Sequence, residues 1–154
     1  MDIANNAKKG RLKKIGIAGL VALLIGGGAA WYLFTQKFED TATTKAEYTV
    51  QAKALIDEFR KNDSAANKKY AEKIITVSGM VSAIEPADTT LNVKMADTTN
   101  GSYIIFAFQQ QDFASVKKIK QGDNVFIKGS CSGGAYSEIL ETEFISFKRC
   151  SLNK

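Results

Sequence analysis

Two cysteines are the residues whose chemistry is easiest to place in this chain. Cys131 and Cys150 each end a predicted strand, 124–131 and 139–150, so neighbouring strands can bring their side chains within disulfide reach. An oxidising compartment favours such a bond, which would contribute roughly 3 kcal/mol. We therefore predict a Cys131–Cys150 disulfide, with two buried free thiols as the alternative. The sequence has no Cys-x-x-Cys motif, which argues against redox catalysis.

A second pair of residues has side chains suited to binding a ligand. Tyr103 and Lys94 lie on neighbouring predicted strands, where an aromatic ring and an ammonium group could hold an oligosaccharide or, less favoured, single-stranded nucleic acid. Phe106 and Phe108 share the other face of their strand, and we expect them in the core. Tyr103 and Lys94 are therefore the candidate ligand face.

The remaining polar residues indicate little chemistry. Glu141 and Glu143 share one face of the last predicted strand, which we expect to be solvated. Asp97–Gly101 lacks the spaced carboxylates of a calcium loop and is predicted to be a turn. The chain contains no histidine, the usual proton shuttle and the commonest zinc ligand. We predict no catalytic residue, no metal and no cofactor.

Hydrophobic periodicity predicts the elements that position these residues. Helical spacing of Tyr48, Ala52, Leu55, Ile56 and Phe59 predicts a helix from Lys45 to Asn62, and a shorter helix follows at 65–71. A third short helix begins after Asp112. The predicted strands cover residues 74–84, 91–95, 103–108, 124–131 and 139–150.

This order of elements predicts the fold class. Three strands, a helix and two strands fit an all-β OB-fold, a five-stranded Greek-key barrel with a helix between strands three and four. A β-sandwich is the main alternative. Gly79 is expected to bend the first strand, and Gly133-Gly134 to turn the chain between the last two.

A run of twenty uncharged residues, 15–34, precedes this domain. As a helix it would span ~30 Å, the hydrocarbon thickness of a bilayer. Trp31 and Tyr32 at its end suit the headgroup layer. Five basic residues precede the run, so the positive-inside rule places residues 1–14 in the cytoplasm. A signal peptide cleaved near 28–30 is the alternative. No cysteine lies nearby to take a lipid, which argues against a lipoprotein.

Small residues recur every fourth position within the predicted span. This stripe would let another helix approach closely, so it is a candidate packing face for other membrane subunits or for self-association. Small residues are also common in membrane helices generally. The stripe consists of Ala18, Ala22, Gly26 and Ala30.

The net charge of +5 is concentrated at the start of the chain. Residues 1–14 contain five of the 21 basic residues and one of the 16 acidic residues, a net charge of +4, which leaves +1 for the remainder. A domain that neutralises many phosphates needs a basic surface. We therefore expect no nucleic-acid partner.

Several short motifs resemble a known family. They are Asn62-x-x-Ala65-Ala66-x-x-x-Tyr70-x-x-Lys73, Lys120-x-Gly122-Asp123 and Cys150-Ser151-Leu152. Over about residues 45–152 the chain resembles the bacterial envelope OB-fold family labelled "tRNA-anticodon-like". The resemblance implies a barrel in the envelope. The family has no established catalytic residues to carry over, and its label refers to fold similarity, which does not establish tRNA binding.

These observations define five expected segments. They are a basic cytoplasmic stub (1–14), a transmembrane helix (15–34), a linker (35–44), a helical lead-in (45–72) and the barrel (73–154). We expect a non-catalytic protein that spans the bacterial inner membrane once, with a periplasmic domain acting as an interaction module or accessory subunit of a membrane protein assembly. A periplasmic module that binds an oligosaccharide or another ligand is the alternative.

Overall fold

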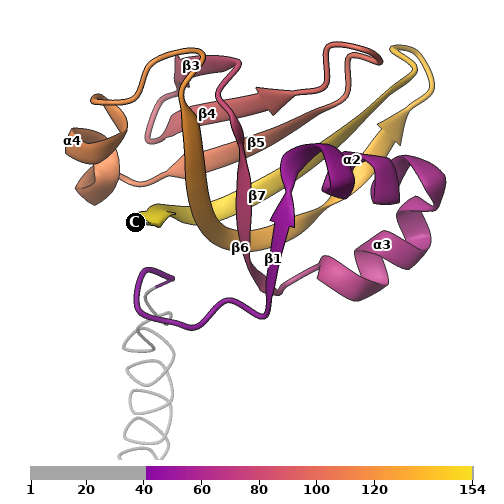
Figure 1. Cartoon of the computed structure of the whole chain (residues 1–154), viewed down its shortest axis with the longest axis horizontal. Coiled ribbons are helices and arrows are strands. Elements are labelled where there is room, and N and C mark those ends of the chain that lie inside the picture. Colours follow the sequence, from indigo (N-terminus) through magenta and orange to yellow (C-terminus); the bar gives the residue numbers. More distant parts are fainter. Residues whose placement is uncertain (1–40, 154) are drawn as a thin grey trace, which may run out of the picture. The chain divides into compact units, whose positions relative to one another are not determined.

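The computed structural model describes residues 41–153, and within them a closed β-barrel is decorated by helices (Figure 1). The predicted stub and span, with the stripe Ala18, Ala22, Gly26 and Ala30, lie outside the described residues, as does most of the linker. Within residues 41–153, no helix is both long and apolar enough to cross a bilayer.

The sheet of the barrel is mixed, and its strand order is β1-β2-β6-β7-β5-β4-β3. Its seven strands, among the described residues, are β1 (Tyr48–Gln51), β2 (Ile74–Met80), β3 (Ala83–Pro86), β4 (Leu91–Ala96), β5 (Tyr103–Phe108), β6 (Asn124–Ser137) and β7 (Thr142–Asn153). The helices are α2 (Ala52–Lys61), α3 (Asp63–Tyr70), the 3₁₀ turn η1 (Gln110–Asp112) and α4 (Phe113–Val116).

The barrel is closed by β2 and β3, which follow one another in the chain and act as the two halves of one bent strand. β2 pairs antiparallel with β6, and β3 pairs antiparallel with β4. β5 and β7 pair in parallel, the one parallel contact that a five-stranded OB Greek key requires. The predicted OB-fold is confirmed, with η1 and α4 between its third and fourth strands.

The bend in the first barrel strand lies at Val81–Ser82 instead of at Gly79. Val81 is buried. Its N–H donates to the carbonyl oxygen of Asp123, and its own carbonyl oxygen accepts from the N–H of Gly122, both in the loop before β6. The N–H of Ser82 donates to the carbonyl oxygen of Lys94 of β4. At this point the chain therefore stops pairing with β6 and begins to pair with β4. Gly79 serves a different purpose: a Cβ there would lie 2.8 Å from the Cβ of Ala52. The glycine lets the start of α2 approach the barrel.

The predicted first helix is wrong over its first turns. Residues Tyr48–Gln51 form β1, which pairs in parallel with β2, and α2 begins at Ala52. Tyr48 and Val50 pack against the core from this strand. The remainder of the prediction holds, because α2 buries Leu55, Ile56 and Phe59.

The predicted turn at Gly133-Gly134 is also wrong, because β6 continues through it to Ser137. The two glycines sit beside a register shift between β6 and β7, which is a β-bulge. A Cβ on Gly134 would lie 2.5 Å from the Phe59 ring, and Gly133 has φ of +102°. Glycine is required here so that the helices can pack directly on the backbone of β6.

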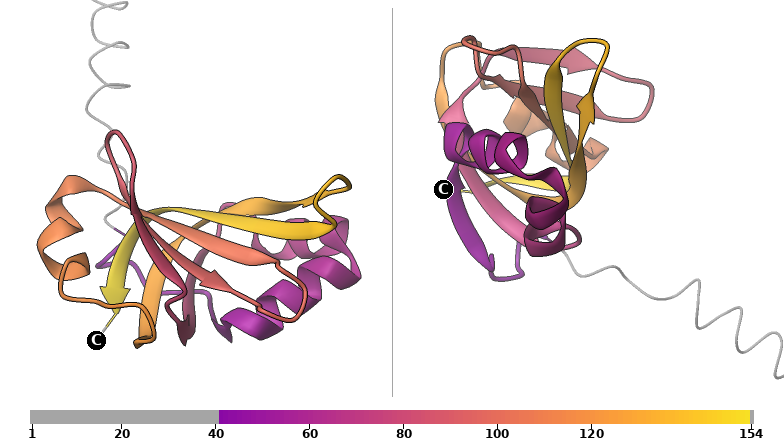
Figure 2. Two further views of the ribbon diagram at one scale, coloured as in Figure 1. Left: turned by 90° about the horizontal axis from the view of Figure 1, so that it is seen from above. Right: turned by 90° about the vertical axis from the view of Figure 1, so that its right-hand side faces the viewer.

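The helices and loops divide the barrel into two ends. The β4–β5 and β6–β7 loops lie at one end, near α2 and α3, while α4 and the C-terminus lie at the other (Figures 1 and 2). Buried aromatic and aliphatic side chains fill the interior. The largest are Phe59, Tyr70, Phe106, Phe108 and Phe147.

Candidate binding surfaces of the barrel

Lys94 and Tyr103 lie side by side on the outer surface of the barrel. The Lys94 Nζ atom is 5.5 Å from the centroid of the Tyr103 ring, within cation–π range. The same ammonium group is 2.8 Å from a carboxylate oxygen of Glu85. Tyr103 also stacks against Phe144 of β7, with ring centroids 6.5 Å apart. The structure therefore brings together the two residues predicted for the ligand face and adds Phe144.

An apolar pair projects from the connection between β6 and β7. Ile139 is 95% exposed and Leu140 is 67% exposed. Glu138 and Glu141 flank the pair, and Glu141 has φ of 53°, which turns the chain into β7. We call residues Glu138–Glu141 the hairpin tip. The two adjacent side chains form a small exposed apolar patch in an otherwise polar loop.

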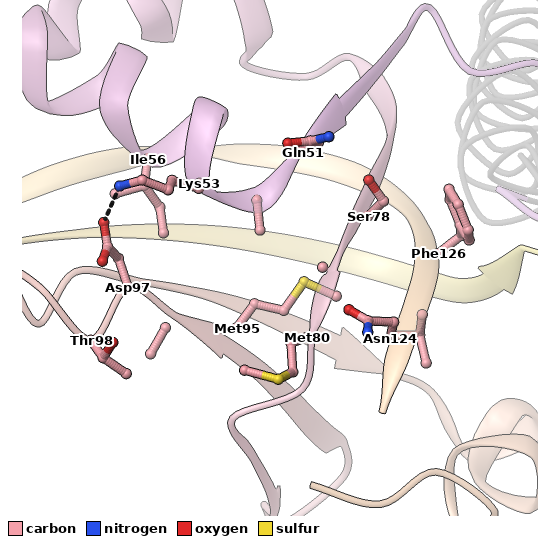
Figure 3. Close-up of a pocket in the computed structure, with 14 residues that line it drawn as sticks. Gln51, Lys53, Ile56, Ser78, Met80, Met95, Asp97, Thr98, Asn124 and Phe126 are labelled. Carbon is pink, nitrogen blue, oxygen red and sulfur yellow. Dashed lines mark hydrogen bonds and ion pairs between the residues drawn. The ribbon is translucent and has the colours of Figure 1, made fainter. Parts of the chain in front are cut away.

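A groove of about 450 Å³ opens where β2, β4, β6 and the start of α2 meet (Figure 3). Met95 and Ile56 line it from within, while Met80 and Phe126 form an apolar rim that is 60% and 52% exposed. The Lys53–Asp97 ion pair lies at the other side of the groove, with Nζ and Oδ2 3.1 Å apart. We call this the methionine groove. Neither Lys94 nor Tyr103 lines it.

Asp97 is fixed by the turn that it begins. Its Oδ1 accepts hydrogen bonds from the N–H and hydroxyl of Thr99, and its Oδ2 accepts from Asn100 and Lys53. These bonds, those from Thr99 first, hold the pKa of Asp97 well below its usual value. Asp97–Gly101 is the β4–β5 turn that the sequence predicted.

Glu143 corrects the prediction of a solvated face on the last strand. It is 1% exposed, and neither carboxylate oxygen has a hydrogen-bond partner within the described structure. Arg60 of α2 donates to the hydroxyl of Ser102, which itself accepts from the Glu143 N–H. Burial raises the pKa of Glu143, Asp63 adds to the rise, and Arg60 opposes it. The α2–α3 pair covers this strand, a tertiary contact that alternation along β7 does not reveal.

Cys131 and Cys150 are separate buried thiols in the structure, contrary to the predicted disulfide. Cys131 lies opposite Phe147 in the β6–β7 register, so Cys150 falls further along β7 and its sulfur packs against Gly129 instead. Burial raises the pKa of both thiols. Among the residues that the structure describes, no group of three histidine, cysteine or acidic side chains could hold a metal.

Comparison with known proteins identifies the family. A family model described as tRNA_anti-like matches residues 12–142. The chain belongs to the tRNA_anti-like family. This assignment confirms the resemblance drawn from the sequence motifs, and the matched residues of this tRNA_anti-like protein include the predicted span. A comparison with curated proteins finds no match.

One solved structure supports the fold of this tRNA_anti-like protein, and a second shows a weaker likeness. A "putative nucleic acid-binding lipoprotein" from Klebsiella pneumoniae is 20% identical, with a TM-score of 0.53, over 77% of this chain and 100% of that one. A replication factor A related protein from Methanobacterium thermoautotrophicum is 19% identical, with a TM-score of 0.40, over 54% of this chain and 81% of that one. The first of these likenesses supports the fold alone.

Sequence reasoning missed the hairpin tip, the methionine groove and the buried Glu143. The tip could have been found, because Ile139-Leu140 between two glutamates is an unusual apolar pair in a polar stretch. The predicted strand 139–150 instead begins at this pair. The groove depends on strands that are distant in sequence, and no local signal identifies it.

Proposed function

We propose that this tRNA_anti-like protein is a non-catalytic binding module, anchored by residues 15–34 in the bacterial inner membrane with its barrel in the periplasm. In this role it serves as an interaction module or accessory subunit of a membrane protein assembly. The observation that carries the proposal is the hairpin tip, where Ile139 and Leu140 are exposed to water. Burying such a pair in a partner would recover hydrophobic free energy that the isolated barrel forgoes.

The anchor in this proposal rests on the sequence. Twenty uncharged residues follow a stub that contains five basic groups, a distribution that favours a retained helix with its N-terminus in the cytoplasm. The near-neutral remainder of the chain favours a protein partner over a polyanion.

The chemistry of the tip supports a protein partner. Glu138 and Glu141 flank the apolar pair, and their carboxylates would be repelled by the phosphates of nucleic acid and of anionic lipid. A complementary partner has an apolar cleft with basic residues at its rim. Apolar anchors surrounded by polar groups are the usual arrangement of energetically important interface residues.

Native mass spectrometry of the full chain, purified in a mild detergent, tests this function. We expect the wild type to retain a partner subunit or a second copy, and the double variant Ile139→Ser/Leu140→Ser to lose it. The control is Lys117→Ser/Lys118→Ser, which also changes two exposed residues but leaves the tip intact. A wild-type chain that is always monomeric, with no companion, would contradict the proposal.

The Tyr103 surface favours a second candidate function, binding of an oligosaccharide. Two stacked aromatic rings next to an ammonium group form a platform on which sugar rings could lie. Titration with chito-oligosaccharides, followed by calorimetry, should give a binding isotherm that Tyr103→Ala abolishes and that Phe126→Ala leaves unchanged. Binding of oligothymidylate instead would favour a nucleic-acid ligand, and no binding of either would exclude this candidate.

A further inference from the structure

The outer surface of β1, β2 and β6 carries a patch without any charged side chain. Strand pairing places Gln51 beside Ser78, Ser78 beside Phe126, and Met80 beside Asn124. Alternation along β2 and β6 directs these residues outward, because Val77 and Ile127 face the core. We call these five residues with Asn153, the partner of Phe126 on β7, the uncharged face. Met80 and Phe126, which also form the rim of the methionine groove, are its exposed apolar side chains (Figure 3).

The same surface of the barrel holds the chain segment that arrives from the N-terminal side. Lys128 lies two residues beyond Phe126 on β6, so both side chains are on the outer face. Its Nζ atom donates to the carbonyl oxygens of Ala42 and Thr44, at 2.7 and 3.0 Å, and the residue is only 9% exposed. Burial of an ammonium group is costly unless it is hydrogen-bonded in this way. From Ala42 onward the chain is therefore fixed beside the uncharged face.

The length of the connection limits how far this face can lie from the bilayer. The predicted span ends at Phe34 and the first described residue is Thr41, so six residues join the two. Fully extended, the seven Cα–Cα steps from Phe34 to Thr41 reach at most ~25 Å. The hairpin tip lies at the far end of β6 from Lys128, roughly 30 Å away at the rise of a β-strand. The uncharged face therefore begins next to the segment that Lys128 holds, whereas the hairpin tip is remote from that segment.

We propose that the uncharged face rests on the membrane surface, with Phe126 and Met80 in the headgroup region of the phospholipid bilayer. The inference depends on the proposed anchor. Aromatic and thioether side chains suit the interface between hydrocarbon and water, and amide and hydroxyl groups can bond to headgroups. The face contains no carboxylate that an anionic lipid would repel, unlike the hairpin tip with Glu138 and Glu141. The barrel would then lie with one side on the bilayer and the tip directed along or away from it.

Quenching of tryptophan fluorescence by brominated phospholipids tests the contact. The full chain carries one tryptophan, Trp31, so Trp31→Phe allows a single reporter to be introduced elsewhere. We would reconstitute Phe126→Trp, and Ile139→Trp as the matched control, into vesicles of phosphatidylethanolamine and phosphatidylglycerol. We expect bromolipid to quench the reporter at 126 at least two-fold and to leave the one at 139 unchanged.

Two other results at position 126 would overturn the proposal. A reporter that iodide in the buffer quenches as strongly as the one at 139 would show that the face is in water. A reporter shielded from both iodide and bromolipid would show that protein covers the face. The unmodified chain separates these failures from failure of the anchor, because Trp31 itself must be quenched by bromolipid if residues 15–34 span the membrane.

Lys128 provides an independent test of the orientation. Lys128→Gln should release the segment at Ala42 and Thr44 and reduce the bromolipid quenching of the 126 reporter at least two-fold, while Lys128→Arg should retain most of it. Circular dichroism must show that both variants remain folded. Equal quenching in folded Lys128→Gln would contradict the role given to this lysine.

Discussion

Asn67 and Gly134 exchange two hydrogen bonds that attach α3 to β6. The Gly134 N–H donates to Asn67 Oδ1 at 2.9 Å, and the Asn67 amide donates to the Gly134 carbonyl oxygen at 3.0 Å. The pair joins residues 67 positions apart in sequence, and it lies where β6 has passed Ser130, the last residue that β6 pairs with β2. Helices and barrel are thus joined by polar bonds as well as by apolar packing.

Substitution at this junction should destabilise the domain in two distinct ways. Asn67→Ala leaves a backbone N–H and a carbonyl oxygen unpaired, and we expect a loss of about 1–3 kcal/mol in urea unfolding followed by circular dichroism. Gly134→Ala places a methyl group against the Phe59 ring, and overpacking of this kind costs about 1–3 kcal/mol. In the double variant Gly134→Ala/Phe59→Leu the two effects should be less than additive, because the smaller side chain relieves the contact. If the losses of stability in the two single variants add up to that of the double variant, the Phe59 ring is not what the new methyl group contacts.

Glu143 should make the domain less stable as pH rises. A carboxyl group whose pKa is raised on folding binds more protons in the folded state, so stability falls between its unfolded and folded pKa values. Glu143→Gln removes this charge, and we expect it to raise the midpoint of thermal unfolding by several degrees at pH 7 but by little at pH 4. If the variant and the wild type differ in midpoint by the same amount at pH 7 and at pH 4, ionisation of Glu143 does not destabilise the folded domain.

Asp97 should have the opposite dependence on pH. Its pKa is lowered on folding, so the stability that it contributes is present at neutral pH and is lost as pH falls through the folded value. Asp97→Ala should therefore lower the unfolding midpoint at pH 7, and the difference from wild type should shrink under strongly acidic conditions. Lys53→Met is the control for the ion pair alone and should have the smaller effect, because Lys53 is largely exposed.

The two cysteines should be unreactive in the folded protein. Burial raises the pKa of both thiols, and only the thiolate attacks a disulfide reagent. Modification by 5,5′-dithiobis(2-nitrobenzoate) should be at least a hundred-fold slower in the native full chain than in urea. Intact mass under non-reducing conditions should match two free thiols, and a mass lower by two hydrogens would restore the Cys131–Cys150 disulfide.

The parts of the fold that local patterns specify were predictable. Tyr103–Phe108 forms a strand with the predicted bounds, because its alternation and the turn at Asn100-Gly101 are local signals. The order of strands and helix along the chain was then sufficient to predict the OB-fold. The parts that failed depend on distant partners: Tyr48 belongs to a strand only because β2 is available to pair with it, and Gly134 is a packing site only because Phe59 lies above it.

The candidate surfaces divide in the same way. Lys94 and Tyr103 could be placed together because strand alternation and hairpin order determine which residues are neighbours. The buried position of Glu143 and the methionine groove arise from α2 lying against the barrel, which periodicity within one strand does not encode. Ile139 was predicted to begin a strand, but β6 extends past the glycines and leaves it at the hairpin tip.

Site-specific photo-crosslinking in intact cells tests the central claim most directly. With benzoylphenylalanine at Leu140, the membrane-anchored module that we propose should give one discrete adduct, in a membrane fraction that alkaline carbonate does not release. The same probe at Lys118 should give none. Recovery of the chain in the soluble fraction, or the same adducts from both positions, would contradict the proposal of an anchored module that binds its partner through the hairpin tip.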